Sequence, residues 1–87
     1  MKVLKFDRSA TPWCRDNEMI KFFIIHQIEY IRQRLRANGY IYLSDIYETF
    51  GVAWDPHDEN TVWIHNEHDF QLRYARVGDD AFEIYIA

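Results

Sequence analysis

Seven side chains of types that bind metal ions lie close together in the second half of the chain. They are Asp55, His57, Asp58, Glu59, His65, His68 and Asp69. Imidazole and carboxylate groups together can hold zinc or manganese. This region has no His-x-x-x-His pair, however, and residues three apart share a face on a helix but not on a strand. We therefore interpret these side chains as parts of two solvated polar loops, and we predict neither a metal nor any other cofactor.

Nucleophilic catalysis needs a thiol or hydroxyl beside a base, and the sequence offers no such pair. Cys14 is the single thiol, and His26 follows it by twelve residues. On one helix the two side chains would be about 18 Å apart, which is too far for proton transfer. Ser9 and Ser44 both occur where a turn or a helix cap is expected. The sequence therefore predicts no catalytic nucleophile.

Two further patterns that could support catalysis have simpler structural explanations. Asp79-Asp80 provides paired carboxylates, as acid–base chemistry requires, but a hairpin turn explains them equally well. The glycines at 39, 51 and 78 are isolated from one another, so no glycine-rich loop is available to hold a phosphate. We predict that the chain is not an enzyme.

The charges are distributed unevenly along the chain. The formal net charge is −4, yet residues 1–39 carry a balance of +4 and residues 40–87 a balance of −8. A winged-helix mode of DNA binding is disfavoured, because Asp79-Asp80 would lie at the tip of the wing and the short helix would carry Asp45 and Glu48. We predict no direct binding to nucleic acid. The alternative interpretation is that the two halves fold on each other and neutralise most of these charges.

Aromatic residues are interspersed with carboxylates in the acidic half, which suits docking on a basic protein surface. The aromatic residues are Tyr40, Tyr42, Tyr47, Trp54 and Trp63. Most of them are equally suited to a core, and Trp54, beside a proline-containing loop, is expected to be partly exposed. The residues predicted to bind a partner are Asp45, Glu48, Trp54, Asp55, Asp58, Glu59, Glu67, Asp69, Asp79 and Asp80.

The length and composition limit the class of protein. A chain of 87 residues fits a single domain, residues 1–87, and a hydrophobic content of 48% is sufficient for a core. No apolar run approaches the roughly 18 residues that a membrane span needs, and residues 1–6 are too short and too interrupted by lysine for a signal peptide. A single cysteine allows no internal disulfide. We expect a protein of the cytoplasm without membrane contact.

Five apolar residues spaced three or four positions apart predict one long helix. They are Ile20, Ile24, Ile28, Ile31 and Leu35, and Gly39 suits the left-handed position after the last turn. The helix could begin at Pro12, with Thr11 as its cap, or later, with Asp16 or Asn17 as its cap. The later start is favoured, because a helix from residue 12 would be about 39 Å long, whereas the expected radius of gyration is only about 12 Å. Residues 12–15 then form a turn that brings Trp13 to the core.

The first half of this helix, residues 19–25, is apolar on almost all sides. A helix that lies on one sheet needs only one apolar stripe, so Phe22 and Ile25 require a further cover. The short second helix, the N-terminal segment or another chain could provide it. Cover within the monomer is favoured, and a homodimer through residues 19–25 is the alternative.

After Gly39 the pattern changes to short strands and one short helix. Residues 40–43 alternate as in a strand, and residues 61–64 can form another strand. Between them Ser44 or Asp45 caps a helix that ends at Gly51, with Glu48 in capping-box register. The last two strands lie around Phe70–Tyr74 and Phe82–Ile86. Their apolar residues face the same side of the sheet only if the loop between the strands has three residues, 78–80. Residues 3–6 can add an edge strand. The predicted fold class is α+β, with one long and one short helix packed on a small antiparallel sheet that ends in a C-terminal hairpin.

The segment GYIYLSDIYETFG, residues 39–51, resembles a pattern in small proteins of phages and conjugative elements of Gram-positive bacteria. Those proteins have a long helix before the pattern, a Gly-Trp soon after it, and an apolar strand at the end. Here Ser44 replaces an asparagine, Phe50 a leucine, and Ala53 the glycine before Trp54; residues 55–69 depart most. The resemblance covers about half of the chain. It implies an origin in a mobile element and no particular activity.

These patterns together predict a non-enzymatic protein-binding module of phage or mobile-element origin. The partner would be a host protein with a basic, nucleic-acid-binding surface, and the module would act as an inhibitor in the manner of anti-CRISPR proteins. The alternative function is that of a structural, self-assembling accessory protein whose dimer interface is the apolar helix segment 19–25.

Overall fold

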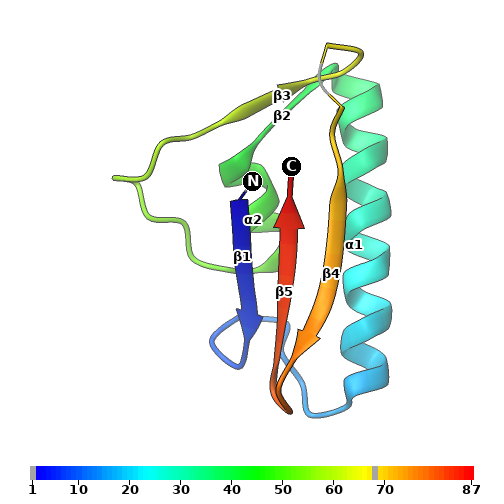
Figure 1. Cartoon of the computed structure of the whole chain (residues 1–87), viewed down its shortest axis with the longest axis vertical. Helices are drawn as coiled ribbons and strands as arrows, with labels where there is room; N and C mark the ends of the chain where they lie inside the picture. Colours follow the sequence, from blue (N-terminus) through cyan, green and yellow to red (C-terminus); the bar gives the residue numbers. More distant parts are fainter. Residues whose placement is uncertain (1, 68) are drawn as a thin grey trace.

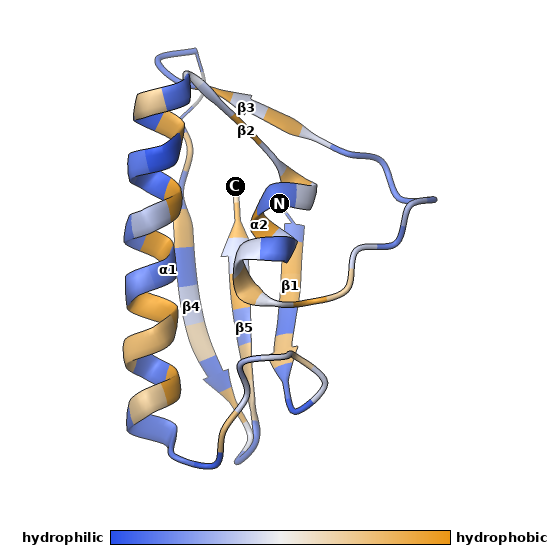
Figure 2. Ribbon diagram, turned by 180° about the vertical axis from the view of Figure 1, so that it is seen from behind, coloured by the Kyte–Doolittle hydropathy of each residue, from blue (hydrophilic) through white to orange (hydrophobic). Residues whose placement is uncertain are grey.

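The computed structural model describes residues 2–67 and 69–87, and its architecture is α+β (Figure 1). Strands β1 (Lys2–Asp7), β5 (Ala81–Ile86) and β4 (Leu72–Val77) form an antiparallel sheet in that spatial order. Helices α1 (Asn17–Asn38) and α2 (Leu43–Phe50) both lie on one side of this sheet (Figures 1 and 2). Strands β2 (Tyr40–Tyr42) and β3 (Val62–Ile64) pair separately. The predicted fold class is confirmed.

Both ends of α1 are determined by local hydrogen bonds. The carboxylate of Asp16 accepts hydrogen bonds from the N–H groups of Glu18 and Met19 at 3.0 and 3.3 Å, which satisfies two donors of the first turn. At the other end Gly39 has φ = 85°, and its N–H donates to the carbonyl of Leu35 at 2.8 Å. The predicted start near Asp16 and the predicted end at Gly39 are therefore confirmed.

The core lies between α1, α2 and the sheet. The five residues of the predicted apolar stripe are all buried in α1: Ile20, Ile24, Ile28, Ile31 and Leu35. Phe6 from β1 lies at their N-terminal end, with ring centroids 5.7 Å from Phe23 and 6.3 Å from Phe50. Trp13, in the turn before α1, packs on the same ring at 5.7 Å, as the sequence predicted.

The register of the C-terminal hairpin follows the apolar residues of its two strands. Tyr74 lies opposite Ile84, and Val77 lies opposite Ala81, so residues 78–80 form a three-residue loop. This pairing sends Phe82, Ile84 and Ile86 to the same side of the sheet as Leu72, where all four are buried. Strand β1 pairs with the other edge of β5, which leaves β1 and β4 as the two edges of the sheet.

The start of α2 differs from the prediction. The helix begins at Leu43, so neither Ser44 nor Asp45 is its N-cap, and Glu48 plays no part in a capping box. The reason is that the loop before β3 already satisfies the first donors of the helix: Leu43 N–H donates to the carbonyl of Thr61 at 2.8 Å, and Ser44 N–H to Asn60 Oδ1 at 2.9 Å. Asp45 instead accepts a hydrogen bond from the Tyr42 N–H at 3.0 Å.

The surplus apolar residues of α1 are not covered within the chain, contrary to the favoured prediction. Phe22 is 60% exposed, Ile25 43% and Met19 63%, and Figure 2 shows hydrophobic residues over most of this half of α1. The contact between the two helices explains this result, because Gln27 Nε2 donates to the carbonyl of Thr49 in α2 at 3.0 Å. At 3.6 residues per turn, Phe22 lies about 140° around the helix from Gln27. Helix α2 therefore cannot reach it.

Candidate functional site

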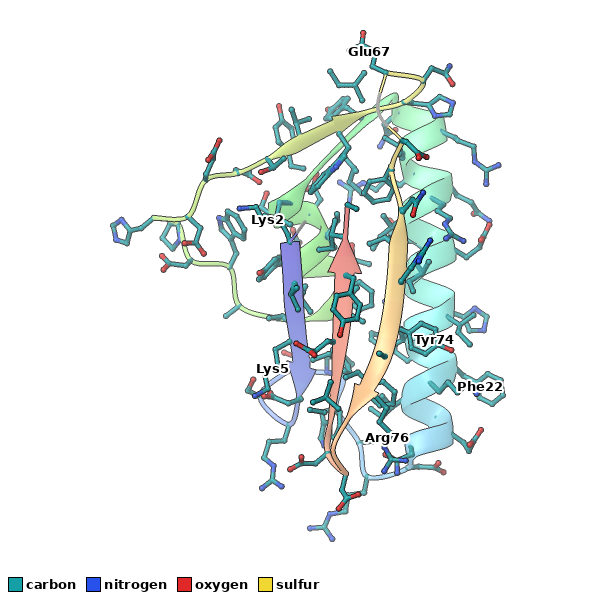
Figure 3. All side chains as sticks on the ribbon, viewed as in Figure 1. Lys2, Lys5, Phe22, Glu67, Tyr74 and Arg76 are labelled. Atoms are coloured by element: carbon teal, nitrogen blue, oxygen red, sulfur yellow. The ribbon has the colours of Figure 1, made fainter. Side chains whose placement is uncertain are left out.

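The structure distributes the predicted partner-binding residues over separate parts of the surface. Glu67 and Asp69 belong to the segment between β3 and β4, whereas Asp79 and Asp80 form the tip of the β4–β5 hairpin. These two places lie at opposite ends of the longest dimension of the molecule, which measures 37 Å (Figures 1 and 3). The remaining residues lie on α2 and on the long loop between α2 and β3. The ten residues therefore do not form one continuous surface.

Three of the predicted carboxylates are already paired with arginines of the chain. Asp45 lies 3.5 Å from the guanidinium of Arg34, and Asp80 lies 3.2 Å from that of Arg8. Asp79 approaches Arg76 at 4.0 Å. The pairs of Asp79 and Asp80 are exposed and contribute about 0–1 kcal/mol each to stability, whereas the Arg34–Asp45 pair is partly buried. All three pairs reduce the negative charge that a partner would meet. The two charged halves of the chain thus neutralise each other at Asp45 and Asp80, whereas Arg76 and Asp79 both belong to the acidic half.

Glu67 and Asp69 also face basic side chains. They line a pocket of about 580 Å³ together with Arg32 and Arg36 of α1. The carboxylate of Asp69 additionally accepts a hydrogen bond from Gln71 Nε2 at 3.2 Å. This end of the molecule therefore presents charges of both signs.

The loop after α2 carries several carboxylates, and we call residues 55–59 the acidic loop. Asp55, Asp58 and Glu59 are exposed, as is Glu48 on the preceding helix, and none forms an ion pair within the described residues. Asp55 shapes the loop, because its carboxylate accepts the N–H of His57 at 2.9 Å and its carbonyl accepts the N–H of Asp58 at 3.0 Å. The acidic loop is thus a locally ordered turn with uncompensated negative charge.

Two aromatic side chains lie at the base of the acidic loop. The rings of Tyr47 and Trp54 meet edge to face, with centroids 5.1 Å apart and an interplanar angle of 79°, and both side chains are half-buried. Burial, and to a smaller extent the negative charge of Asp58, raises the pKa of the Tyr47 hydroxyl above its ordinary value. That influence shows that Asp58 lies near the aromatic pair. Trp54 has the partial exposure that the sequence predicted.

The other aromatic residues of the acidic half are divided between core and surface. Trp63 is buried and packs on Phe70 at 5.4 Å. Tyr40 and Tyr42 are 49% and 41% exposed and contact each other edge to face at 5.6 Å on β2. The two tyrosines alternate with the buried Ile41, as a strand requires.

The histidines and carboxylates that suggested a metal site are dispersed. The described residues, 2–67 and 69–87, contain no group of three or more histidine, cysteine, aspartate or glutamate side chains arranged to hold an ion. His57 belongs to the acidic loop, whereas the N–H of His65 donates to the carbonyl of Gly39 at 2.9 Å, beside the end of α1. His68, the third histidine of that set, lies outside the described residues.

Cys14 and His26 do not share a helix. Cys14 precedes the first residue of α1, and its Sγ donates to the carbonyl of Asp16 at 3.7 Å. His26 is exposed in the middle of α1. The thiol is thus engaged in the turn that starts the helix.

One surface feature was not identified from the sequence. A groove of about 650 Å³ runs between α1 and β4, and its apolar walls are formed by Ile25 and Ile28 on one side and by Leu72 and Tyr74 on the other. The guanidinium of Arg32 crosses one end and donates to the carbonyl of Leu72 at 3.4 Å. The excess of apolar residues at 19–25 was the sequence signal for this feature. Its position became evident only from the packing of α1 against β4.

Comparisons with known proteins identify no relative: no family model, no curated protein and no solved structure matches the chain. The resemblance of residues 39–51 to proteins of Gram-positive mobile elements therefore stays a prediction. No helix among the described residues is long and apolar enough to cross a membrane.

Proposed function

We propose that the chain is a non-enzymatic protein-binding module of phage or mobile-element origin. It docks the acidic loop on a basic, nucleic-acid-binding surface of a host protein in the host cytoplasm. In doing so it acts as an inhibitor comparable to anti-CRISPR proteins. The binding surface consists of the acidic loop, Glu48 and the Tyr47–Trp54 pair.

The observation that carries this proposal is the uncompensated charge of the acidic loop. Asp55, Asp58 and Glu59 are exposed and form no ion pair within the described residues, whereas Asp45, Asp79 and Asp80 are paired with arginines. Uncompensated carboxylates attract a basic partner over several ångströms and accelerate the encounter. The carboxylates of the acidic loop are therefore more available to a partner than Asp45, Asp79 and Asp80 are.

The aromatic pair supports the same surface. Interface energy concentrates in aromatic side chains that are held rigidly and surrounded by polar residues. Trp54 meets this description, because its ring is fixed against Tyr47 at 5.1 Å and remains half-buried rather than fully covered. The neighbouring carboxylates would form the polar rim of such an interface.

The test is affinity capture from the bacterial host with matched variants. One variant neutralises the loop by Asp55→Asn, Asp58→Asn and Glu59→Gln; the asparagine at position 55 still accepts the N–H of His57. We expect the wild-type chain to retain a nucleic-acid-binding protein, to release it at high salt, and to compete with DNA for it. The neutralised variant should retain little of that protein.

The control for the capture experiment changes the same number of charges elsewhere. It carries Glu18→Gln, Glu67→Gln and Asp69→Asn, none of which lies in the acidic loop. This control should capture the partner as the wild-type chain does. Equal capture by the neutralised variant and the wild-type chain would refute docking through the acidic loop.

A second candidate function is self-association through α1. The observation that favours it is the exposure of Met19, Phe22 and Ile25, at 63%, 60% and 43%, on one half of one helix. Apolar side chains grouped in this way mark interaction surfaces in monomeric structures. In this alternative the chain is a structural accessory protein whose assembled form is a homodimer.

A further inference from the structure

The exposed residues that border the groove form one flank of α1. On a helix with 3.6 residues per turn, the flank spans an arc of about 100° and runs the length of the helix. Its exposed members are Glu18, Lys21, Phe22, Ile25, Glu29, Arg32 and Arg36. The centre of this flank is apolar; the N-terminal end carries one acidic and one basic side chain, and the C-terminal end carries one acidic and two basic side chains.

The apolar centre of the flank continues onto the sheet. Ile25 and the buried Ile28 form one wall of the α1–β4 groove, and Leu72 and Tyr74 form the other. Figure 3 shows Tyr74 on β4 beside α1, with Phe22 projecting outward from the helix somewhat lower in the view. The helix flank and the groove together therefore make one apolar surface of a width that a second helix can cover.

The charges on the flank occur in the order negative, positive, negative, positive, positive: Glu18, Lys21, Glu29, Arg32 and Arg36. Positions 18 and 32 are equally far from residue 25, as are positions 21 and 29. If a second copy of α1 lies antiparallel to the first with Ile25 opposite Ile25, Glu18 of one copy therefore lies opposite Arg32 of the other, and Lys21 lies opposite Glu29. Each of the first four charges would then meet one of opposite sign, whereas Arg36 would have no counterpart, because position 14 precedes α1.

We propose that two copies of the chain pair through this flank, with their α1 helices antiparallel and a two-fold axis near Ile25. This inference rests on the second candidate function and specifies its geometry. Phe22 of each copy lies in the groove of the other, near Ile28. Glu18 pairs with Arg32 of the second copy, and Lys21 with Glu29 of the second copy, so the two-fold axis generates four ion pairs.

Charge complementarity is the reason to choose a second copy as the occupant of the groove. A parallel pair of helices would place Glu18 opposite Glu18 and Arg32 opposite Arg32, which is repulsive at both ends. Within the chain, Glu29 lies 3.7 Å from Arg36, but both side chains are more than half exposed, so this pair is easily exchanged. Lys21 forms no ion pair within the described residues.

The test of self-association is the molar mass in solution. Light scattering after size exclusion should give twice the chain mass of 10.6 kDa for the wild-type protein. Phe22→Lys should give a monomer whose circular dichroism is unchanged, because Phe22 is 60% exposed. A wild-type chain that remains a monomer at high concentration would refute both the second candidate function and the geometry.

The test of the geometry is a charge exchange. Lys21→Glu places like charges opposite Glu29 twice in each dimer, so we expect the dissociation constant to rise about tenfold. Adding Glu29→Lys to the same chain should restore most of the affinity, whereas Lys2→Glu, a matched charge change outside the flank, should alter it little. If Phe22→Lys abolishes the dimer but Lys21→Glu is not rescued by Glu29→Lys, self-association through the flank is supported and the antiparallel arrangement is refuted.

Discussion

Gly51 joins the helix α2 to the segment that leads to the acidic loop, and its replacement by alanine should destabilise the protein strongly. The residue has φ = +71°, where an L side chain is strained. A Cβ atom at this position would lie 2.5 Å from Cδ of Pro12 and 3.4 Å from Cβ of Thr11. Since the proline ring is rigid, the turn before α1 and the end of α2 would have to move apart.

The magnitude follows from two separate costs. The left-handed conformation costs an alanine about 1–2 kcal/mol, partly offset by a smaller unfolded-state entropy. Forcing the contact with Pro12 adds about 1–3 kcal/mol, as other overpacked sites do. It also weakens the hydrogen bond that Thr11 N–H donates to the carbonyl of Gly51 at 3.1 Å. We expect Gly51→Ala to lower the free energy of unfolding by about 3 kcal/mol.

Gly39 provides the matched control for this prediction. It also has a positive φ, +85°, but a Cβ atom there meets nothing within 4 Å. Gly39→Ala should therefore cost only about 1 kcal/mol. Urea unfolding followed by tryptophan fluorescence measures both variants, and the difference of about 2 kcal/mol corresponds to a midpoint shift of about 1–2 M. Equal losses in the two variants would refute the close packing of Pro12 on Gly51.

Three further predictions concern the core and two titrating groups. Ile24 is fully buried, so Ile24→Ala should lower the unfolding free energy by about 2–5 kcal/mol in chemical denaturation. Hydrogen bonds from Ser9, of which the one from its hydroxyl has the larger effect and the one from its N–H the smaller, hold the pKa of Asp7 below its ordinary value. The ionised Asp7 carboxylate therefore stabilises the folded protein above the unfolded-state pKa, and this contribution is lost as the pH falls through the folded-state pKa. Ser9→Ala should raise that pKa in an NMR titration, and an unchanged value would contradict this cause. Because the pKa of Tyr47 is raised, the contribution of its neutral hydroxyl to the stability of the folded protein is lost as the pH rises through the folded-state pKa. In a spectrophotometric titration Asp58→Asn should lower this pKa only partly, because burial is the larger cause of the shift.

Much of the fold could be predicted because local patterns determine it. The spacing from Ile20 to Leu35, the cap at Asp16 and the glycine at 39 together define α1 from end to end. The hairpin register followed from a parity argument, since only an odd loop places Tyr74 opposite Ile84 with matching sides. These features depend on neighbours in sequence or on one strand pair, so the sequence contains the necessary information.

The start of α2 and the exposure of Phe22 could not be predicted in the same way. The first N–H groups of α2 are satisfied by Asn60 and Thr61, which come later in the chain and reach the helix only through the β2–β3 pairing. The cover over Phe22 depends on which side of α1 the second helix occupies, and that side is set by tertiary packing. The sequence showed an excess of apolar residues but not where they would lie.

The candidate site shows the same division between local and tertiary information. The acidic loop was evident as a run of polar residues around Pro56, and the partial burial of Trp54 was predicted from that context. Which carboxylates remain unpaired was not predictable, because the arginines that neutralise Asp45 and Asp80 belong to the first half of the chain. Charge counts along the sequence give the balance of each half but not the contacts between the halves.

Hydrogen exchange on the complex with the captured partner is the most direct test of docking through the acidic loop. In the free chain the amides of this exposed loop should exchange rapidly, which makes protection by a partner easy to detect. We predict protection of residues 52–60 on binding and no change at the hairpin tip, residues 78–80. Protection confined to α1 and β4, with the acidic loop unchanged, would contradict the proposed binding surface.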